Sequence, residues 1–248
     1  MIGCLSVTRR ELLALWTTPL AWVSLVAFLI LQGGAYSAIV TSLTTLPELS
    51  LDVGPTQAFF GQSIFPPLSM LLLCPALTMR TFSEERRSGS IELLLSAPIS
   101  AAAMVVGKFL AVWLTYAAMW IPTLLYFYVL RESGHIEWPI VASSYLAIVG
   151  IGGGMLALGL LASVVTRSQL VAAMLAGGLI FALVLVGIGE NILLYGWEHE
   201  VCRQLSVESQ LQEMAQGIIS SRRLVFDLTL MVLPLAFSVH IVDGWRRS

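Results

Sequence analysis

The 248-residue chain has few charged side chains: Asp, Glu, Lys and Arg make up 11% of it, whereas hydrophobic residues make up 57%. Soluble domains carry about 25% charged residues. A soluble fold of this size could not cover its surface with so few charges, so lipid is the natural solvent for the excess apolar surface. The composition excludes an ordinary soluble domain and predicts an integral membrane protein, in agreement with the mean hydropathy of +0.87.

Lysine and cysteine are scarce as well. Lys108 is the only lysine, Phe109 follows it, and no glycine stands five positions before the one at 107. The phosphate-binding loop G-x-x-x-x-G-K-[ST] is therefore absent, and the chain cannot bind ATP by that route. We expect a non-catalytic subunit with no cofactor of its own. The cysteines Cys4, Cys74 and Cys202 are predicted to lie inside, within and outside the membrane, so no disulfide framework is expected.

Long apolar runs dominate what is present. A transmembrane helix needs about 20 mostly apolar residues. Six segments meet this requirement, of which the second is the shortest and contains three prolines. The predicted spans are residues 20–40, 63–79, 104–130, 139–165, 169–188 and 224–242. The sequence therefore predicts an all-α polytopic membrane protein with six transmembrane helices, forming a single transmembrane domain over residues 1–248.

Ionisable side chains are missing from the first, second, fourth and fifth of these spans. Lys108, Asp227 and His240 stand near the ends of the third and sixth spans, where such residues usually snorkel or pair locally. A carrier driven by protons or sodium ions usually needs ionisable groups at membrane depth, and an embedded protease needs a polar dyad there. Neither class fits the sequence, so the energy source is expected to lie in another subunit.

Arginine and lysine are distributed unevenly about the predicted spans. With the amino terminus inside, nine of the 13 basic residues fall on the inner side: Arg9, Arg10, Arg80, Arg86, Arg87, Lys108, Arg167, Arg246 and Arg247. The outer side receives Arg131, Arg203, Arg222 and Arg223. The positive-inside rule then predicts a multi-pass protein of the bacterial cytoplasmic (inner) membrane with both termini cytoplasmic.

Two amphipathic helices are predicted outside the spans. Residues 1–19 favour a short interfacial helix on the inner membrane surface, with a frayed tail as the alternative. Its apolar side would carry Leu5, Leu12, Leu13, Leu15 and Trp16, opposite Arg9, Arg10 and Glu11. In the outer loop 189–223, Ser206 is expected to cap a helix that packs against the outer mouth or rests on headgroups. Its apolar positions are Val207, Leu211, Met214, Ala215 and Ile218.

Glycines concentrate in the fourth and fifth spans, where Gly150 and Gly154 form a G-x-x-x-G pair and Gly177 and Gly178 follow further on. Small residues of this kind let helices approach closely. The pattern indicates either packing within one bundle or a subunit interface.

The cytoplasmic segment 80–100, RTFSEERRSGSIELLLSAPIS, predicts a helical elbow between spans two and three. Thr81 and Glu84 form a T-x-x-E capping box for a short charged helix that should end near Gly89. Ser90 would cap a second helix that ends at Pro98, and Ser100 would cap span three. The charged tip consists of Glu84, Glu85, Arg86 and Arg87, for which the sequence offers no obvious partner within the chain. Such an elbow suits docking on a soluble partner, although an ordinary solvated loop is the alternative.

The elbow resembles the signature of ABC-2 type permeases, R-x-F-x-E-E-[KR]-x-x-G-[ST]-x-E-L-L-L-x-x-P-[IV]-S followed by G-K. The matching residues are Arg80, Phe82, Glu84, Glu85, Arg86, Gly89, Ser90, Glu92, Leu93, Leu94, Leu95, Pro98, Ile99, Ser100, Gly107 and Lys108. The opening R-R-E-L…P-L-A-W is also similar to that family. Residues 216–223 resemble the G-x-[IV]-[DS]-x-R segment of its gliding-motility (GldF-like) subgroup, which shares the short length and six spans.

The resemblance implies a permease subunit that couples ATP hydrolysis by a separate ATPase to export or mechanical work. In the family, two permeases pair on an ABC ATPase dimer, which binds ATP and Mg, and the elbow is the coupling helix that inserts into the ATPase. The implied ATPase-coupling residues are Arg80, Phe82, Glu84, Glu85, Arg86, Arg87, Gly89, Ser90, Glu92, Leu94 and Pro98. Further expected partners are a second permease copy or homologue, membrane lipid and an accessory membrane subunit, but no nucleic acid.

Two alternatives stay open at this point: a permease for copper-site maturation of a metalloenzyme, and a mechanotransmission complex that moves no solute. In related permeases spans one, two and five line the path between protomers. The polar residues of that path, Gln32, Thr41, Ser63 and Ser69, are too few and generic to identify a substrate.

Overall fold

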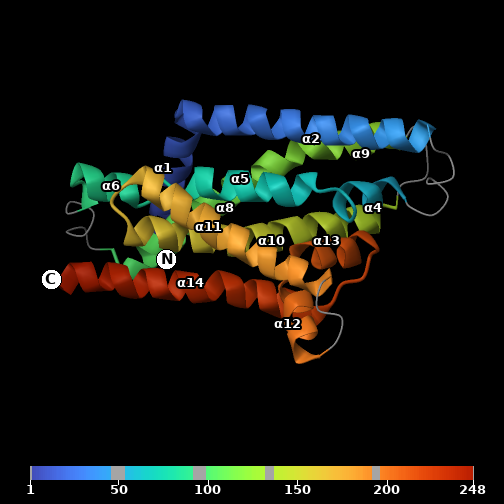
Figure 1. The fold of residues 1–248 in the computed structure, drawn as a ribbon. Helices are drawn as coiled ribbons and strands as arrows, with labels where there is room; N and C mark the ends of the chain where they lie inside the picture. The colour runs from blue at the N-terminus through green and yellow to red at the C-terminus, as the bar shows by residue number, and fades with distance from the viewer. Residues whose placement is uncertain (1, 46–53, 92–98, 132–136, 192–195, 248) are drawn as a thin grey trace.

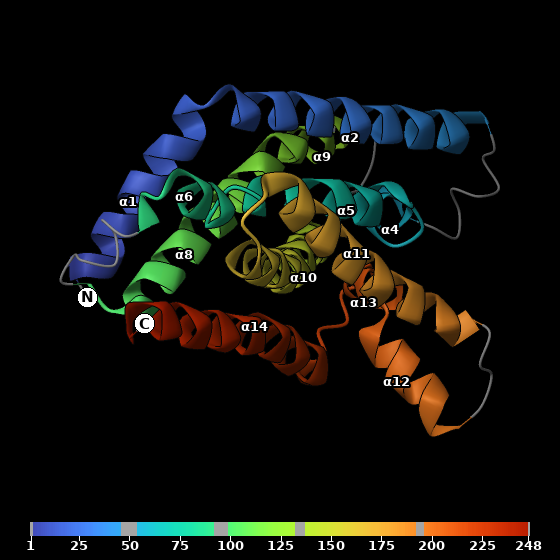
Figure 2. The same cartoon turned by 60° about the vertical axis from the view of Figure 1, so that its left-hand side comes forward.

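The computed structural model describes residues 2–45, 54–91, 99–131, 137–191 and 196–247, and this part of the chain contains helices and no strands. The long helices lie side by side in one bundle, with α2 at one edge and α14 at the other (Figure 1). The amino and carboxyl ends lie at the same end of the bundle in both ribbon views (Figures 1 and 2). The all-α prediction is confirmed for the described residues.

Five of the six predicted spans coincide with helices long and apolar enough to cross a membrane. They are α2 (Pro19–Thr45), the combined run of α8 (Ala101–Trp120), η1 (Ile121–Thr123) and α9 (Leu124–Leu130), then α10 (Trp138–Val165), α11 (Gln169–Ile188) and α14 (Ser221–Arg247). A helix of 20 residues is about 30 Å long, which matches the hydrocarbon core of a bilayer. The chain is therefore a multi-pass membrane protein.

The predicted second span, residues 63–79, forms a shorter helix than expected. It corresponds to α5 (Phe65–Thr78), whose 14 residues extend only about 21 Å at 1.5 Å per residue. Short helices continue it at both ends, α4 (Pro55–Phe60) on one side and α6 (Ser83–Ser88) on the other (Figure 1). The buried rings of Phe59 and Phe60 pack against Phe127 and hold α4 on the bundle. The total of six spans therefore stays a prediction.

Helix α10 lies at the centre of the bundle and packs against α5, α8, α11 and α14. Its glycines make these contacts close. A Cβ atom on Gly154 would lie 2.8 Å from Leu230 of α14, and one on Gly152 would lie 2.3 Å from the Tyr116 ring of α8. A Cβ on Gly150 would lie 3.0 Å from Asp227 Oδ2 of α14, so both members of the G-x-x-x-G pair of α10 pack within the bundle. In contrast, a Cβ on Gly178 of α11 would meet nothing within 4 Å.

Residues 2–17 form the predicted amino-terminal helix, α1 (Ile2–Thr17), and this helix packs against α8. Leu5 and Leu13 are 70% and 56% exposed, whereas Val7 and Thr8 are buried against α8. Glu11, predicted to lie on the polar side of the helix opposite the leucines, is turned toward α8. Glu11 differs from the prediction because α1 packs against α8. The position of α1 on a membrane surface stays a prediction.

The predicted outer loop contains α12 (Trp197–Leu205) and α13 (Val207–Ala215). The predicted cap is confirmed, since the Ser206 hydroxyl accepts a hydrogen bond from the Ser209 amide at 3.2 Å. The predicted apolar positions within α13 are buried against α10 and α4. Ile218 is 55% exposed, so its prediction is wrong, because α13 ends at Ala215 and Gly217 follows with φ +79°.

Polar contacts fasten α13 to the start of α14. The Arg223 guanidinium donates two hydrogen bonds of 2.8 Å to the Glu213 carboxylate. The buried Asp227 accepts a hydrogen bond of 2.6 Å from Gln210. Asp227 thus pairs locally, as predicted for an ionisable residue near the end of a span.

Candidate functional site

The elbow helix α6 lies at the end of the bundle that also carries the two chain ends (Figure 2). Its predicted capping box is absent. The Thr81 hydroxyl donates to the Thr78 carbonyl at 2.8 Å, and no side chain caps the helix from Phe82. Instead, the amides of Phe82 and Ser83 each donate to the Ser163 hydroxyl of α10 at 3.1 Å. The hydroxyl that accepts hydrogen bonds at the start of α6 therefore comes from Ser163 of α10, and not from Thr81 as the capping-box pattern predicts.

The predicted end of the elbow helix is confirmed. Gly89 follows Ser88 with φ +75°, a left-handed conformation that favours glycine. Ser100 also acts as predicted, since its hydroxyl accepts a hydrogen bond from the Ala103 amide at the start of α8. The roles predicted for Glu92, Leu94 and Pro98, and the helix that Ser90 would cap, concern residues 92–98, which lie outside the described part of the chain.

One side of the elbow is held by the buried ammonium of Lys108 on α8. Its Nζ donates to Glu85 Oε1 at 2.8 Å and to the Thr81 carbonyl at 2.8 Å, and lies 3.1 Å from Glu11 Oε1 of α1. Lys108 is 1% exposed. Arg10 completes the cluster, 2.6 Å from Glu11 and 3.4 Å from Glu85. The prediction that the charged tip has no partner within the chain is therefore wrong for Glu85.

The charges of this cluster support one another. Burial of Glu11 acts to raise its pKa, but the positive charges of Lys108 and Arg10 and their hydrogen bonds outweigh burial, so the pKa of Glu11 is lowered from its ordinary value. The hydrogen bond to Glu11 raises the pKa of Arg10. Glu11 is thus ionised at neutral pH, and the buried lysine charge is compensated, which a buried charge requires.

The other side of the elbow is held by Arg86. Its Nη1 donates to the Val164 carbonyl at the end of α10 at 2.7 Å, and its guanidinium lies 4.4 Å from the centre of the Trp245 ring of α14. A guanidinium at this distance over an indole makes a favourable cation–π contact. Burial and the nearby Arg167 lower the pKa of Arg86 from its ordinary value. The prediction of an unpartnered charge is therefore wrong for Arg86 as well.

The remaining charges of the elbow point outward. The side chains of Glu84 and Arg87 are exposed, in contrast to those of Glu85 and Arg86. Phe82 is fully buried and anchors the start of α6, with Lys108 Nζ 5.1 Å from its ring centre. Arg80 borders a cavity of about 140 Å³ together with Glu84 and Lys108. The four consecutive charges thus form an inward pair and an outward pair.

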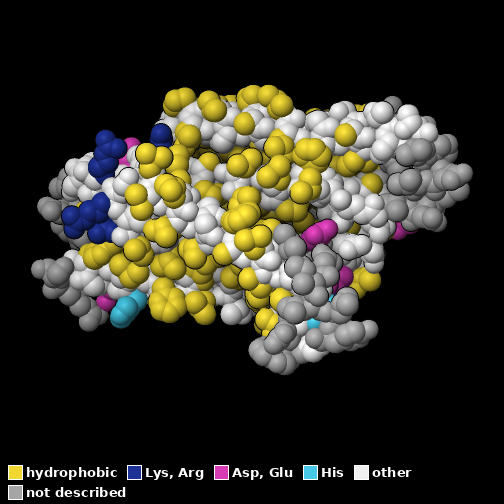
Figure 3. All heavy atoms as spheres, in the orientation of Figure 1, with side chains coloured by type: hydrophobic (Ala, Val, Ile, Leu, Met, Phe, Trp, Pro, Cys, Tyr) yellow, Lys and Arg dark blue, Asp and Glu magenta, His cyan; other side chains and the backbone are white. Residues whose placement is uncertain are grey.

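Basic side chains gather at the same end of the molecule, where Figure 3 shows Lys and Arg over α6 and its surroundings. Apolar side chains cover the long helices between the two ends (Figure 3). This separation matches a bundle whose middle faces hydrocarbon and whose basic end lies at the level of lipid headgroups.

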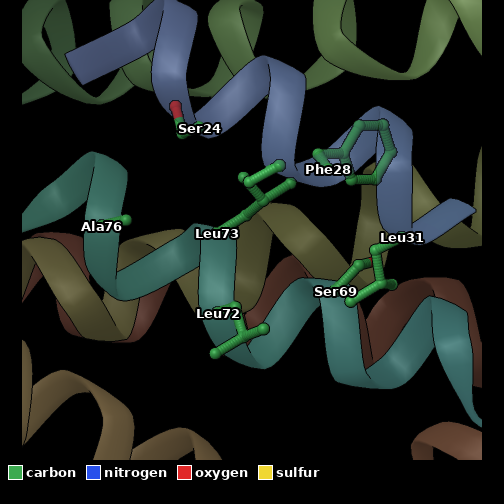
Figure 4. Close-up of a pocket in the computed structure, with 8 residues that line it drawn as sticks. Ser24, Phe28, Leu31, Ser69, Leu72, Leu73 and Ala76 are labelled. Atoms are coloured by element: carbon green, nitrogen blue, oxygen red, sulfur yellow. The ribbon is translucent and has the colours of Figure 1, made fainter.

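A second candidate site is an apolar groove of about 230 Å³ between α2 and α5 (Figure 4). It is lined by Ser24, Ala27, Phe28, Leu31, Ser69, Leu72, Leu73 and Ala76. The neighbouring Gln32 is buried and donates through Nε2 to Ser69 Oγ at 2.9 Å. The groove can accept an apolar group but offers only hydroxyls to orient a polar one.

The described residues contain no group of three or more His, Cys, Asp or Glu side chains placed to hold a metal ion. The structure therefore adds no observation in favour of the copper-site alternative.

Comparison with known proteins bears on the family. No curated protein matches the chain. The family described as ABC-2 family transporter protein matches residues 5–216, which include most of α1, the elbow and the first five predicted spans. The match covers most of the 248 residues and contains the Lys108 cluster and the groove. The chain belongs to the ABC-2 family of transporter proteins.

Proposed function

We propose that this chain is the permease subunit of an ABC transporter whose ATPase is a separate polypeptide, and that α6 is the helix on which the ATPase docks. Family membership supports a membrane subunit that works with an ABC ATPase. The observation that carries the docking role is the outward pair, Glu84 and Arg87, on an elbow held in place from both sides. Two exposed charges of opposite sign offer a partner surface a defined electrostatic pattern.

The orientation of the chain is part of this proposal. The basic end of the bundle carries α6 and both chain ends (Figures 1 and 3). The positive-inside rule assigns that end to the cytoplasm, where an ATPase has access to it. The outer helices α12 and α13 then lie on the opposite side of the membrane.

The cargo path is proposed to run along α2, α5 and α11, between this chain and a second permease copy or homologue. The groove between α2 and α5 supports an apolar or amphipathic cargo that enters sideways from the bilayer. The exposed Leu170, Met174 and Leu175 give α11 an apolar outer face for lipid or a second subunit. Assignment to the GldF-like subgroup rests on residues 216–223, the short length and the six predicted spans, and a mechanical role in place of export depends on that assignment.

The test is purification of the full chain in mild detergent with the ATPase that accompanies it. The double variant Glu84→Lys with Arg87→Glu should lose the ATPase while the permease still folds, because both side chains lie in water. The control Glu208→Lys changes an exposed acid on α13 at the far end of the bundle and should keep the ATPase. If no ATPase accompanies the parent chain, or if the double variant retains it in full, this function is wrong.

A further inference from the structure

We infer that Lys108 is a positioning residue that ties the elbow α6 to the amino-terminal helix α1 and to α8, so that these three elements move as one body. The inference rests on the proposed function and deepens it, because it identifies how displacement of the docking helix is passed into the bundle. It assigns a role to the glycine–lysine pair of the signature, Gly107 and Lys108, that differs from contact with the ATPase.

The ammonium group of Lys108 is fully used by three acceptors. An ammonium has three N–H donors, and Nζ lies 2.8 Å from the Thr81 carbonyl, 2.8 Å from Glu85 Oε1 and 3.1 Å from Glu11 Oε1. These acceptors come from the turn before α6, from α6 itself and from α1. One buried side chain therefore joins three segments, and none of them can shift alone without leaving a charge or a donor unpaired.

Gly107 makes this junction possible. A Cβ atom at this position would lie 2.9 Å from Val7 Cγ1 and 3.0 Å from the Cys4 carbonyl oxygen of α1. The Thr8 hydroxyl also donates to the Gly107 carbonyl at 3.1 Å. Glycine thus admits the backbone of α1 against α8, which brings Glu11 within reach of the lysine that follows.

The contacts of the elbow divide between two sides of the bundle. Through Glu85 it is bound to α1 and α8, and through Arg86 it is bound to α10 and α14. Adjacent residues on a helix project about 100° apart because one turn takes 3.6 residues. Lys108 and its two carboxylate partners form the first attachment, which includes the contact of Arg10 with Glu85. Neutralising Lys108, Glu11 and Glu85 together should therefore release α6 from α1 while the Arg86 attachment persists.

The first experiment measures this release in the full chain without any ATPase. The probe is a pair of spin labels at Ser88→Cys on α6 and Arg9→Cys on α1, both exposed positions, with the three native cysteines replaced. The test variant is Lys108→Met combined with Glu11→Gln and Glu85→Gln, which removes the tie without burying an unpaired charge, because the remaining Arg10 side chain is 55% exposed. The distance distribution between the labels should be narrow in the parent and clearly broader in the variant.

A matched label pair serves as the control. Labels at Ser88→Cys and Arg167→Cys span α6 and the end of α10, where the attachment by Arg86 is untouched, and their distribution should stay as narrow in the variant as in the parent. Neutralising the exposed pair Arg222 and Glu200, whose side chains are 64% and 47% exposed, should change neither distribution.

The second experiment uses the complex with the co-purified ATPase. The triple variant should keep the ATPase bound, because Glu84 and Arg87 are unchanged. Its permease-stimulated ATP hydrolysis should fall by at least about fivefold, the lower end of typical coupling between sites. If Lys108 served fold stability alone, the folded triple variant would stimulate hydrolysis at the parent level, because it contains no buried unpaired charge.

The outcomes separate the two claims. Failure of the parent chain to bind an ATPase refutes the proposed function. An ATPase that binds the parent, together with unchanged label distances and unchanged stimulated hydrolysis in the triple variant, overturns the role of Lys108. Loss of ATPase binding in that variant also overturns it, because Lys108 would then act on the docking surface and not on the tie.

Discussion

At the residue scale, Gly152 shows how little space separates α10 from α8. A Cβ atom there would lie 2.3 Å from the Tyr116 ring, whose side chain is fully buried. Gly152→Ala should therefore lower the free energy of unfolding by about 1–3 kcal/mol, the usual cost of overpacking a core. Thermal unfolding of the purified chain in detergent measures the change.

The control for this substitution is Gly178→Ala on α11, where the new methyl group meets nothing within 4 Å. Alanine favours a helix over glycine by about 1 kcal/mol, so this variant should be as stable as the parent or more stable. Equal melting temperatures for the Gly152 variant and the parent would contradict the close packing described for α10.

Glu11 gives the cluster at the base of the elbow a predictable pH dependence. Its pKa is lowered from an ordinary value of 4.5. A carboxyl with a lowered folded-state pKa contributes stability that is complete above the ordinary value and is lost as the pH falls through the folded value. The parent should therefore lose stability as the pH falls below about 4.5, and Glu11→Gln should lose less over the same range.

The measurement is the unfolding temperature of both chains from neutral to acidic pH. Glu213, whose pKa is lowered chiefly by its hydrogen bond with Arg223, contributes in the same direction and is present in both chains. The difference between the two curves therefore isolates Glu11, and parallel curves would contradict its pairing with Lys108.

At the scale of elements, the neighbouring acids Glu84 and Glu85 of the elbow differ in burial and in pairing. Glu85→Lys places a second ammonium beside Lys108 and should destabilise the chain by about 3–5 kcal/mol, because a buried charge loses its partner. Glu84→Lys changes an exposed side chain and should shift stability by less than about 0.5 kcal/mol. Detergent unfolding curves of the two variants should differ clearly, and similar curves would refute the division into inward and outward charges.

The elements that could be predicted are those with strong local patterns. Spans 139–165 and 169–188 agree with α10 and α11 to within a residue. Uninterrupted apolar runs of this length, bounded by polar turns, are compatible only with a membrane-spanning helix. Gly89 ended α6 as expected for the same local reason. The length of α5 was harder to predict, because prolines interrupt the apolar run and the regular helix covers only part of it.

The cluster at the elbow could not be predicted because its members are far apart in the chain. Glu85 lies 23 residues from Lys108 and 75 from Arg10. The Thr81 cap failed for a similar reason, since Ser163 of α10, 81 residues from Phe82, supplies the acceptor. Periodicity identifies which residues are polar, but only the packing of helices shows which of them meet.

At the scale of the whole molecule, topology is open to a direct test. A cysteine at Glu208, exposed on α13, should react with a membrane-impermeant reagent added outside cells. A cysteine at Ser88 on the elbow should react only after the cells are permeabilised. Ser206 is unsuitable as the outer reporter because it is buried and caps α13. The reverse labelling pattern would overturn the proposed orientation.

The shared location of the two chain ends (Figure 1) allows two copies to be joined in tandem by a flexible linker, with no added membrane crossing. Such a single polypeptide fixes the subunit ratio, so a substitution can be placed in one half only. A tandem that supports ATP hydrolysis with its ATPase would show that this permease works with a second copy of itself. A tandem with one altered elbow would then show whether a single intact half is enough.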